Sequence, residues 1–337
     1  MMAKLRSADR QVVAVVALIF VATVWGATFI VVADAIAQYP VYAFLCLRFV
    51  IAALAFLAFF PRVLRRIDLH NLKLGIPAGL LLSAGYILQT LGLLPLSQGG
   101  TTPARTAFLT GMYVVLVPIA QGILKKKMPH RGTIVGVGLA LSGLVLLSGI
   151  TLSGTHGWVL GDSLVLASAF AYAAHMILLG TNDKHHDTLA LTFIQLTVVA
   201  LTTGVMSLAT GEHAGIPTSP NVWFALLTCG LVASAFAFVV QTWAQRILPP
   251  SRVALILISE PALGGLIGWW MAGSAPTREV IGAALMLAGM ITSELMASRQ
   301  AHVQAQRLKR AVEGMPVFTD DPHRNKRVAT ESEEEAR

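Results

Sequence analysis

Long apolar runs separated by short polar segments dominate this chain. Ten such runs, each of about 18 to 25 residues, can be marked along the sequence, and each is long enough to cross a hydrocarbon core of about 30 Å as a helix. Only helices and closed barrels satisfy their backbone in lipid, and these runs are too long and continuous for barrel strands. The pattern therefore predicts an all-α polytopic membrane protein with ten transmembrane helices, at residues 11–35, 40–60, 72–94, 103–124, 131–150, 158–180, 188–209, 221–245, 251–272 and 277–298.

The two halves of the chain repeat part of their pattern. Pro-x-Arg opens the fourth and ninth runs, and each of these runs contains a later proline, Pro118 or Pro261, that we expect to interrupt its helix. The next runs share one pair of glycines at the same spacing, Gly136 and Gly143 in VGVGLALSG and Gly282 and Gly289 in IGAALMLAG, and Gly136 and Gly282 are 146 residues apart. Since five helices is an odd number, a second unit of five enters the membrane inverted relative to the first. The sequence thus predicts two inverted five-helix repeats, at 11–150 and 156–298.

The distribution of charge predicts the orientation. Only 12% of the residues are charged and 55% are hydrophobic, about half the charged fraction of a soluble domain. The connections on one side of the predicted membrane hold nearly all the lysines and arginines, whereas those on the other side hold only Arg105 and Arg278. Short basic loops stay in the cytoplasm, so we expect an inner-membrane protein with both termini cytoplasmic. Residues 1–10 form the N-terminal segment and residues 299–337 a cytoplasmic tail. Its first part, AHVQAQRLKRAVEG from Ala301, is compatible with a short helix on the membrane surface, and the rest is expected to be disordered.

Several segments, in order along the chain, resemble one family of carriers. They are Trp25-Gly26-Ala27-Thr28-Phe29, Arg48-Phe49, SAGYILQTLGLLPLS from Ser83, TAFLTGMYVVLVP from Thr106, ALILISEPALGGLIG from Ala254 and IGAALMLAGMITSEL from Ile281. With these motifs the chain resembles the drug/metabolite transporter superfamily, in its EamA-like group with two five-helix repeats. It departs from the pattern in the turns KKKMPH and MAGSAP, which lack the usual Gly-Glu. The resemblance implies a carrier, often an exporter of amino acids, other metabolites or drugs, that works without ATP.

Two ionisable residues lie deep in predicted helices. Charge in hydrocarbon is costly, so that each of them is expected to have a functional or structural role there. Glu260 is nine residues into the ninth run and precedes Pro261, so that it lies near the membrane midplane beside a broken helix. It is our candidate for substrate binding and for coupling to a proton or ion; the alternative is a structural acid. Arg48 lies midway along the second run. It is a second coupling candidate, able to bind an anion or to pair with Glu260, unless it only ties helices together.

Polar and aromatic residues in other runs are candidates for the wall of a substrate cavity. They are Trp25, Tyr86, Gln89, Tyr172, His175 and Gln241. In the resembled family the cavity is lined mainly by helices 1, 3, 4, 6, 8 and 9, which hold these residues, although such side chains also bond helices together. Asp162, at the start of the sixth run, is expected instead to cap its helix.

These observations predict a secondary-active transporter that exports small amino-acid-like metabolites or drug-like compounds by alternating access. The alternative is an importer or exchanger of nucleotide-sugar type, which would need more basic residues than Arg48 and Arg105 supply; a membrane-embedded lipid enzyme and a passive channel are further alternatives. No Walker A, His-Glu-x-x-His or Gly-x-Ser-x-Gly motif occurs, so we expect no enzymatic activity, no cofactor and no bound metal. The expected partners are a small-molecule substrate and the lipid bilayer, and not nucleic acid.

Overall fold

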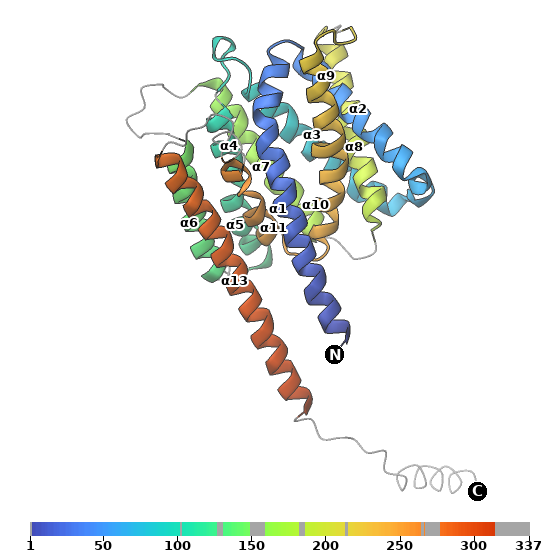
Figure 1. The fold of residues 1–337 in the computed structure, drawn as a ribbon. Coiled ribbons are helices and arrows are strands. Elements are labelled where there is room, and N and C mark those ends of the chain that lie inside the picture. The colour runs from blue at the N-terminus through green and yellow to red at the C-terminus, as the bar shows by residue number, and fades with distance from the viewer. Residues whose placement is uncertain are drawn as a thin grey trace, which may run out of the picture. The chain divides into compact units, whose positions relative to one another are not determined.

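The structure is a computed structural model of the full chain, and it describes residues 2–101, 103–126, 131–148, 159–181, 186–212, 215–263, 266 and 277–313. Every regular element in these ranges is a helix (Figure 1). The chain divides into two compact units, Met1–Glu294 and Leu295–Arg337. The fold that follows is that of the first unit.

The elements agree with the apolar runs of the sequence. They are α1 (Met2–Ile36), α2 (Val41–Phe59), α3 (Leu69–Gly92), α4 (Pro103–Gly111), α5 (Tyr113–Lys125), α6 (Arg131–Ser148), α7 (Leu160–Thr181), α8 (Thr188–Ala209), α9 (Pro220–Leu227), the π-helix η3 (Thr228–Phe236), α10 (Ala237–Gln245), α11 (Pro250–Leu257) and α13 (Thr277–Glu313), with short 3₁₀ turns η1 (Pro61–Arg66) and η2 (Leu96–Gln98). Two consecutive elements, α4 and α5, make up the fourth predicted span, and α9, η3 and α10 make up the eighth.

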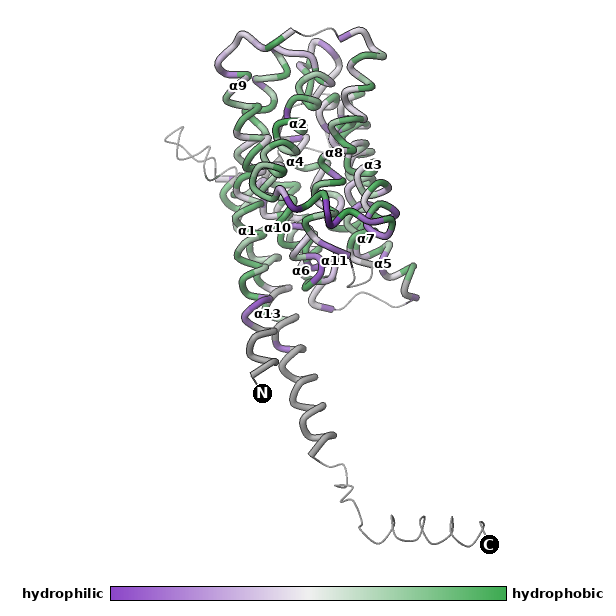
Figure 2. The backbone as a smooth tube through the Cα atoms, turned by 90° about the vertical axis from the view of Figure 1, so that its right-hand side faces the viewer, coloured by the Kyte–Doolittle hydropathy of each residue, from purple (hydrophilic) through white to green (hydrophobic). Residues whose placement is uncertain are grey.

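Within the described residues seven stretches are long and apolar enough to cross a membrane, and two shorter apolar helices, Arg131–Leu146 and Val280–Ser293, fall at the fifth and tenth predicted spans. The ninth predicted span is described only in part, through α11 and the turn that follows it. Large apolar side chains such as Leu54, Leu201 and Val205 are exposed on the helices, and apolar residues run along most of their length (Figure 2). Such a surface suits lipid, since a soluble protein rarely exposes apolar patches of this extent. The chain is therefore an all-α polytopic membrane protein.

The first part of the tail is helical. Residues 299–313 continue α13, in the polar and basic segment for which the sequence allowed a short helix, and not as disordered chain. The remaining residues of the predicted tail, 314–337, lie outside the described residues.

Contacts between loops place the connections in two groups. The α1–α2 turn meets the α8–α9 connection, because Tyr39 Oη donates to Gly215 O at 2.7 Å and Ser219 Oγ bonds Gln38 Oε1 at 3.0 Å. The basic segment η1 meets the start of α8 through the ion pair Arg66–Asp187, at 3.0 Å. In each group, loops that the sequence assigned to the same side of the membrane thus contact each other. We call the second group the basic side.

Helix caps build the basic side. Asp68 caps α3 by accepting the backbone N–H of Asn71 at 2.7 Å, and this bond holds the pKa of Asp68 below its ordinary value. Asp187 caps α8 by accepting from Leu189 and Ala190, and its own N–H donates to the Asn71 side chain at 3.0 Å. These bonds satisfy backbone N–H groups that each helix start leaves without a partner.

Helices α6 and α13 cross at the repeated glycines. A Cβ on Gly136 would lie 2.9 Å from Gly289 O, and one on Gly289 would lie 2.6 Å from Gly136 O, while Gly143 lies equally close against Gly282. The first glycine of each repeat therefore meets the second glycine of the other. This reciprocal pairing is the contact expected at a pseudo-two-fold axis.

Both repeats break a helix at the same place. One break is at Met112, between α4 and α5; the other is at Ile258–Ser259, after α11, where the chain resumes as a helical turn at Glu260. Met112 and Ile258 are 146 residues apart, as Gly136 and Gly282 are. Pro261 explains the second break, since it cannot donate to Leu257 O.

The sequence-based position of the first break was wrong. We expected Pro118 to interrupt the helix, but Pro118 lies inside α5. The break falls six residues earlier, next to Gly111, where Met112 N and Val115 N form tighter bonds to the residue three positions before each of them.

The glycine crossing predicts the effect of a single methyl group. Gly136→Ala should destabilise the protein by about 1 to 3 kcal/mol, because the methyl meets backbone that cannot yield. Gly138→Ala on the same helix is the matched control, since a Cβ there has no heavy atom within 4 Å. Thermal unfolding of the purified variants in detergent measures both. Equal stability of the two variants would contradict the described crossing.

Candidate functional site

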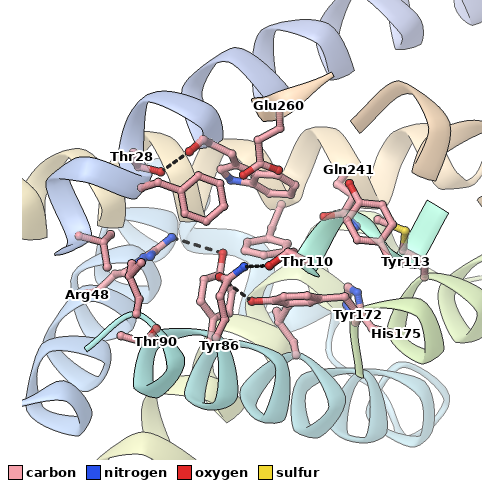
Figure 3. Close-up of a pocket in the computed structure, with 18 residues that line it drawn as sticks. Thr28, Arg48, Tyr86, Thr90, Thr110, Tyr113, Tyr172, His175, Gln241 and Glu260 are labelled. Carbon is pink, nitrogen blue, oxygen red and sulfur yellow. Dashed lines mark hydrogen bonds between the residues drawn. The ribbon is translucent and has the colours of Figure 1, made fainter. Parts of the chain in front are cut away.

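A cavity lies among the spans, at the level of the two helix breaks. Side chains from α1, α2, α3, α4, α5, α7 and α10 line it, together with Glu260 from the turn after α11 (Figure 3). It measures about 80 Å³. The eight residues that the sequence singled out all line this one cavity: Trp25, Arg48, Tyr86, Gln89, Tyr172, His175, Gln241 and Glu260. We call it the central cavity.

Arg48 is buried in this wall with its charge directed at neutral groups. Its side chain is 4% exposed. Its Nε donates to Ser234 Oγ at 2.9 Å and its Nη2 donates to Tyr86 Oη at 3.3 Å, and its guanidinium lies 4.7 Å from the centre of the Tyr86 ring. Among the described residues no carboxylate lies within ion-pairing distance of it. Its positive charge is therefore stabilised by dipoles and an aromatic face, but it is not neutralised.

Glu260 enters the cavity from another side (Figure 3). It begins the helical turn after the break, so that its position depends on Ile258, Ser259 and Pro261. The pairing with Arg48 that the sequence allowed does not occur, since no ion pair joins the two. Within the described part of the chain no residue donates a hydrogen bond to its carboxyl group. The cavity thus holds one basic and one acidic group that are not paired with each other.

The π-helix η3 carries the anchors of two wall residues. Trp25 Nε1 donates to Ala233 O at 2.7 Å, and Ser234 accepts from Arg48. A π-helix in the middle of a long helix is rare and often marks a functional position. Here it joins α1 and α2 to the eighth predicted span at the depth of the cavity.

A hydrogen-bonded chain of neutral groups crosses the cavity beside the first helix break. Tyr172 Oη donates to Gln89 Oε1 at 3.2 Å, and Gln89 Nε2 donates to Thr110 Oγ1 at 2.9 Å. It links α7, α3 and α4, and Thr110 lies two residues before Met112. A movement at this break therefore acts directly on the wall.

His175 is held by a buried partner. Its Nε2 lies 2.6 Å from Gln195 Oε1, and the amide nitrogen of Gln195 donates to Leu191 O. The oxygen of the amide therefore faces the imidazole, which places the hydrogen of His175 on Nε2. This bond between α7 and α8 fixes the ring at the edge of the cavity.

Sequence reasoning missed other polar members of the wall, Thr28, Thr90, Thr110 and Tyr113. Two of them flank the break at Met112. A tyrosine and a threonine inside an apolar run near a helix break were a usable signal, because irregular backbone in a membrane protein occurs where it lines a cavity.

Asp162 does not line the cavity; it anchors α7 at the end opposite the basic side. It is fully buried, and it accepts from Val159 N at 3.0 Å, as the expected cap would. It also accepts from Thr101 Oγ1 at 2.7 Å and forms an ion pair with Arg105 at 2.6 Å. This ion pair and these hydrogen bonds fasten the start of α4 to α7.

This anchor gives a stability prediction. Asp162→Asn should cost about 2 to 4 kcal/mol, because it leaves the largely buried Arg105 without its carboxylate. The control is Arg66→Gln, which breaks the exposed Arg66–Asp187 pair and should cost under about 1 kcal/mol. Thermal unfolding in detergent compares the two. A loss for Asp162→Asn no greater than that for Arg66→Gln would show that the anchor does not stabilise the fold.

Comparisons with known proteins agree with this architecture. The sequence model of the EamA-like transporter family matches residues 12–149 and 159–293. An uncharacterized transporter from Archaeoglobus fulgidus is 30% identical over 243 residues, covering 72% of this chain and 73% of the relative. The uncharacterized transporter YoaV from Bacillus subtilis is 25% identical over 288 residues, covering 84% and 97%. A solved crystal structure shares the fold, with a TM-score of 0.68 over 84% of this chain and 97% of the other at 17% identity.

Proposed function

Because this chain belongs to the EamA-like transporter family and is therefore a membrane transporter, we propose that it is a secondary-active carrier that exports small amino-acid-like metabolites by alternating access. Drug-like compounds of similar size form the second substrate class. The carrier lies in a bacterial-type inner membrane with both termini in the cytoplasm, as the basic connections indicate.

One observation carries the substrate proposal: Arg48 and Glu260 face one cavity without pairing with each other. A zwitterion satisfies both, with its carboxylate toward Arg48 and its ammonium toward Glu260 and the oxygen of Gln241. Binding then repays the cost of holding two charges away from water, because each gains a charged partner. An amino acid carries this pair of groups.

The size of the cavity favours a small substrate over a nucleotide sugar. A cavity of about 80 Å³ suits a molecule of amino-acid size. A nucleotide sugar is several times larger, and its diphosphate needs several cations. Among the described lining residues Arg48 is the only lysine or arginine.

The transport step uses the inverted repeats. We propose that the two helix breaks, at Met112 and Ile258–Ser259, are the points at which the halves flex to open the cavity to one side and then to the other. Glu260 lies directly on the second break, so that its protonation or its contact with substrate acts on the moving part.

The zwitterion model predicts which ligand group each charged residue of the cavity recognises: Arg48 recognises the carboxylate and Glu260 recognises the ammonium. A panel of amino acids, the matching amines without the carboxylate and the matching acids without the amine are tested for thermal stabilisation of the purified protein, since a ligand stabilises the state that it binds. In the unaltered protein the amino acid should stabilise more than the amine or the acid does. Arg48→Gln should abolish the difference in thermal stabilisation between the amino acid and the amine. Glu260→Gln should abolish the difference between the amino acid and the acid.

Ser234→Ala serves as the control, because it removes a neutral partner of Arg48 and leaves both charges. It should keep both advantages. Equal stabilisation by all three ligand types in the unaltered protein would contradict the model.

Coupling is tested separately. In proteoliposomes with an imposed pH gradient, Glu260→Gln should abolish the dependence of flux on the gradient, because an amide does not exchange a proton in this range. Gln241→Leu, which changes a neutral lining residue, should keep that dependence while reducing flux. A pH-driven flux that survives Glu260→Gln would remove the coupling role.

A further inference from the structure

A second cavity lies on the basic side, between the ends of α3, α7, α8 and α10. It measures about 250 Å³ and includes Leu74, Leu179, His186, Thr242, Gln245 and Arg246 in its wall. It shares none of its lining residues with the central cavity. The proposed transport cycle does not use it.

Two buried oxygens in this wall have no donor within the described part of the chain. They are Gln245 Oε1 and Thr242 Oγ1, on side chains that are 5% and 3% exposed. Burial without a hydrogen bond is costly, because the group has lost its water. Gln245 and Thr242 are three residues apart on α10, so that they share a face of the helix. A ligand or solvent that offers hydrogen-bond donors would satisfy both.

Gln245 stands between the two cavities. Its Nε2 lies 3.4 Å from the backbone oxygen of Met176, a residue that lines the central cavity. Because the amide nitrogen faces this carbonyl, the amide oxygen faces away from it. One helical turn earlier on α10, Gln241 lines the central cavity, and its Oε1 is also buried without a donor.

The two cavities resemble each other in part. Each has a glutamine oxygen of α10 without a donor in the described part of the chain, and each has an arginine in its wall, the buried Arg48 in the central cavity and the exposed Arg246 in the second. Arg246 also donates to Thr188 Oγ1 at 3.0 Å, which holds its side chain at the start of α8. An acceptor and a guanidinium together suit a molecule with an ammonium and a carboxylate.

We propose that the second cavity is a separate binding station for a zwitterionic metabolite on the basic side of the membrane. The ammonium donates to Gln245 Oε1 and Thr242 Oγ1, and the carboxylate faces Arg246. The inference takes its substrate class from the proposed function. The second cavity lies one helical turn of α10 from the central cavity. A substrate therefore binds in it before or after it binds in the central cavity.

Cysteine protection tests the station without requiring transport. Cys46 and Cys229 are first replaced by alanine, and Ile247→Cys, at a lining residue that takes no part in the proposed binding, is introduced as a reporter in this background. The neutral reagent methyl methanethiosulfonate labels the thiol in detergent, with and without a mixture of the nineteen standard amino acids other than cysteine, whose own thiol would consume the reagent, as the probe. We expect the mixture to slow labelling about fivefold. Thr110→Cys reports on the central cavity in the same way, and Gln98→Cys, at an exposed position, should show no protection.

A second pair of variants separates occupation of the station from a movement caused by binding elsewhere. Gln245→Leu should weaken protection at Ile247→Cys about fivefold, the loss expected for one hydrogen bond, and leave protection at Thr110→Cys unchanged. Glu260→Gln should have the opposite pattern. This double dissociation supports the station.

Other outcomes overturn it. Protection at Thr110→Cys alone means that the second cavity holds only water, while the proposed function stands. Protection at Ile247→Cys that survives Gln245→Leu but is lost with Glu260→Gln means that it reports a movement. Protection at neither reporter contradicts both the station and the amino-acid substrate, whereas protection at Ile247→Cys alone keeps the station and contradicts the central site.

Discussion

Lipid provides no hydrogen bonds to a backbone, and this constraint orders the whole molecule. It forces each apolar run into a helix, and it allows a helix to break only where protein or a cavity takes over the freed groups. The two breaks described here, at Met112 and at Ile258–Ser259, satisfy this condition. Ser259 Oγ bonds Ile256 O at 2.7 Å, and Thr110 and Tyr113 beside Met112 face the central cavity. The places where the helices are interrupted are thus the places where the cavity is built.

The same constraint made much of the fold predictable. Hydrophobic length alone located the spans, and most of their ends agree with the structure within a few residues, because a helix ends where polar residues reach water. The repeated glycines were also informative. They predicted a duplicated unit, and the structure brings them into reciprocal contact between α6 and α13.

The cavity was partly predictable for a related reason. A charge, an amide or a tyrosine in hydrocarbon needs a partner or a cavity, so the sequence singled out eight residues that prove to line the same space. Their partners could not be predicted. Arg48 bonds Ser234 and Tyr86 instead of Glu260 because η3 brings Ser234 within reach, and no local sequence signal marks a π-helix. The break at Met112 likewise depends on packing and not on the nearest proline.

The two repeats differ in charge beside their corresponding helix breaks. At the spacing that relates the breaks, the counterpart of Glu260 is Val114, which is fully buried against Leu144, Leu255 and Ile258. If the carrier alternates by letting each repeat adopt the conformation of the other, a symmetric duplicate would have two states of equal free energy. A single carboxylate removes that degeneracy. Whatever charges or neutralises Glu260 then sets which face of the membrane the resting protein opens to.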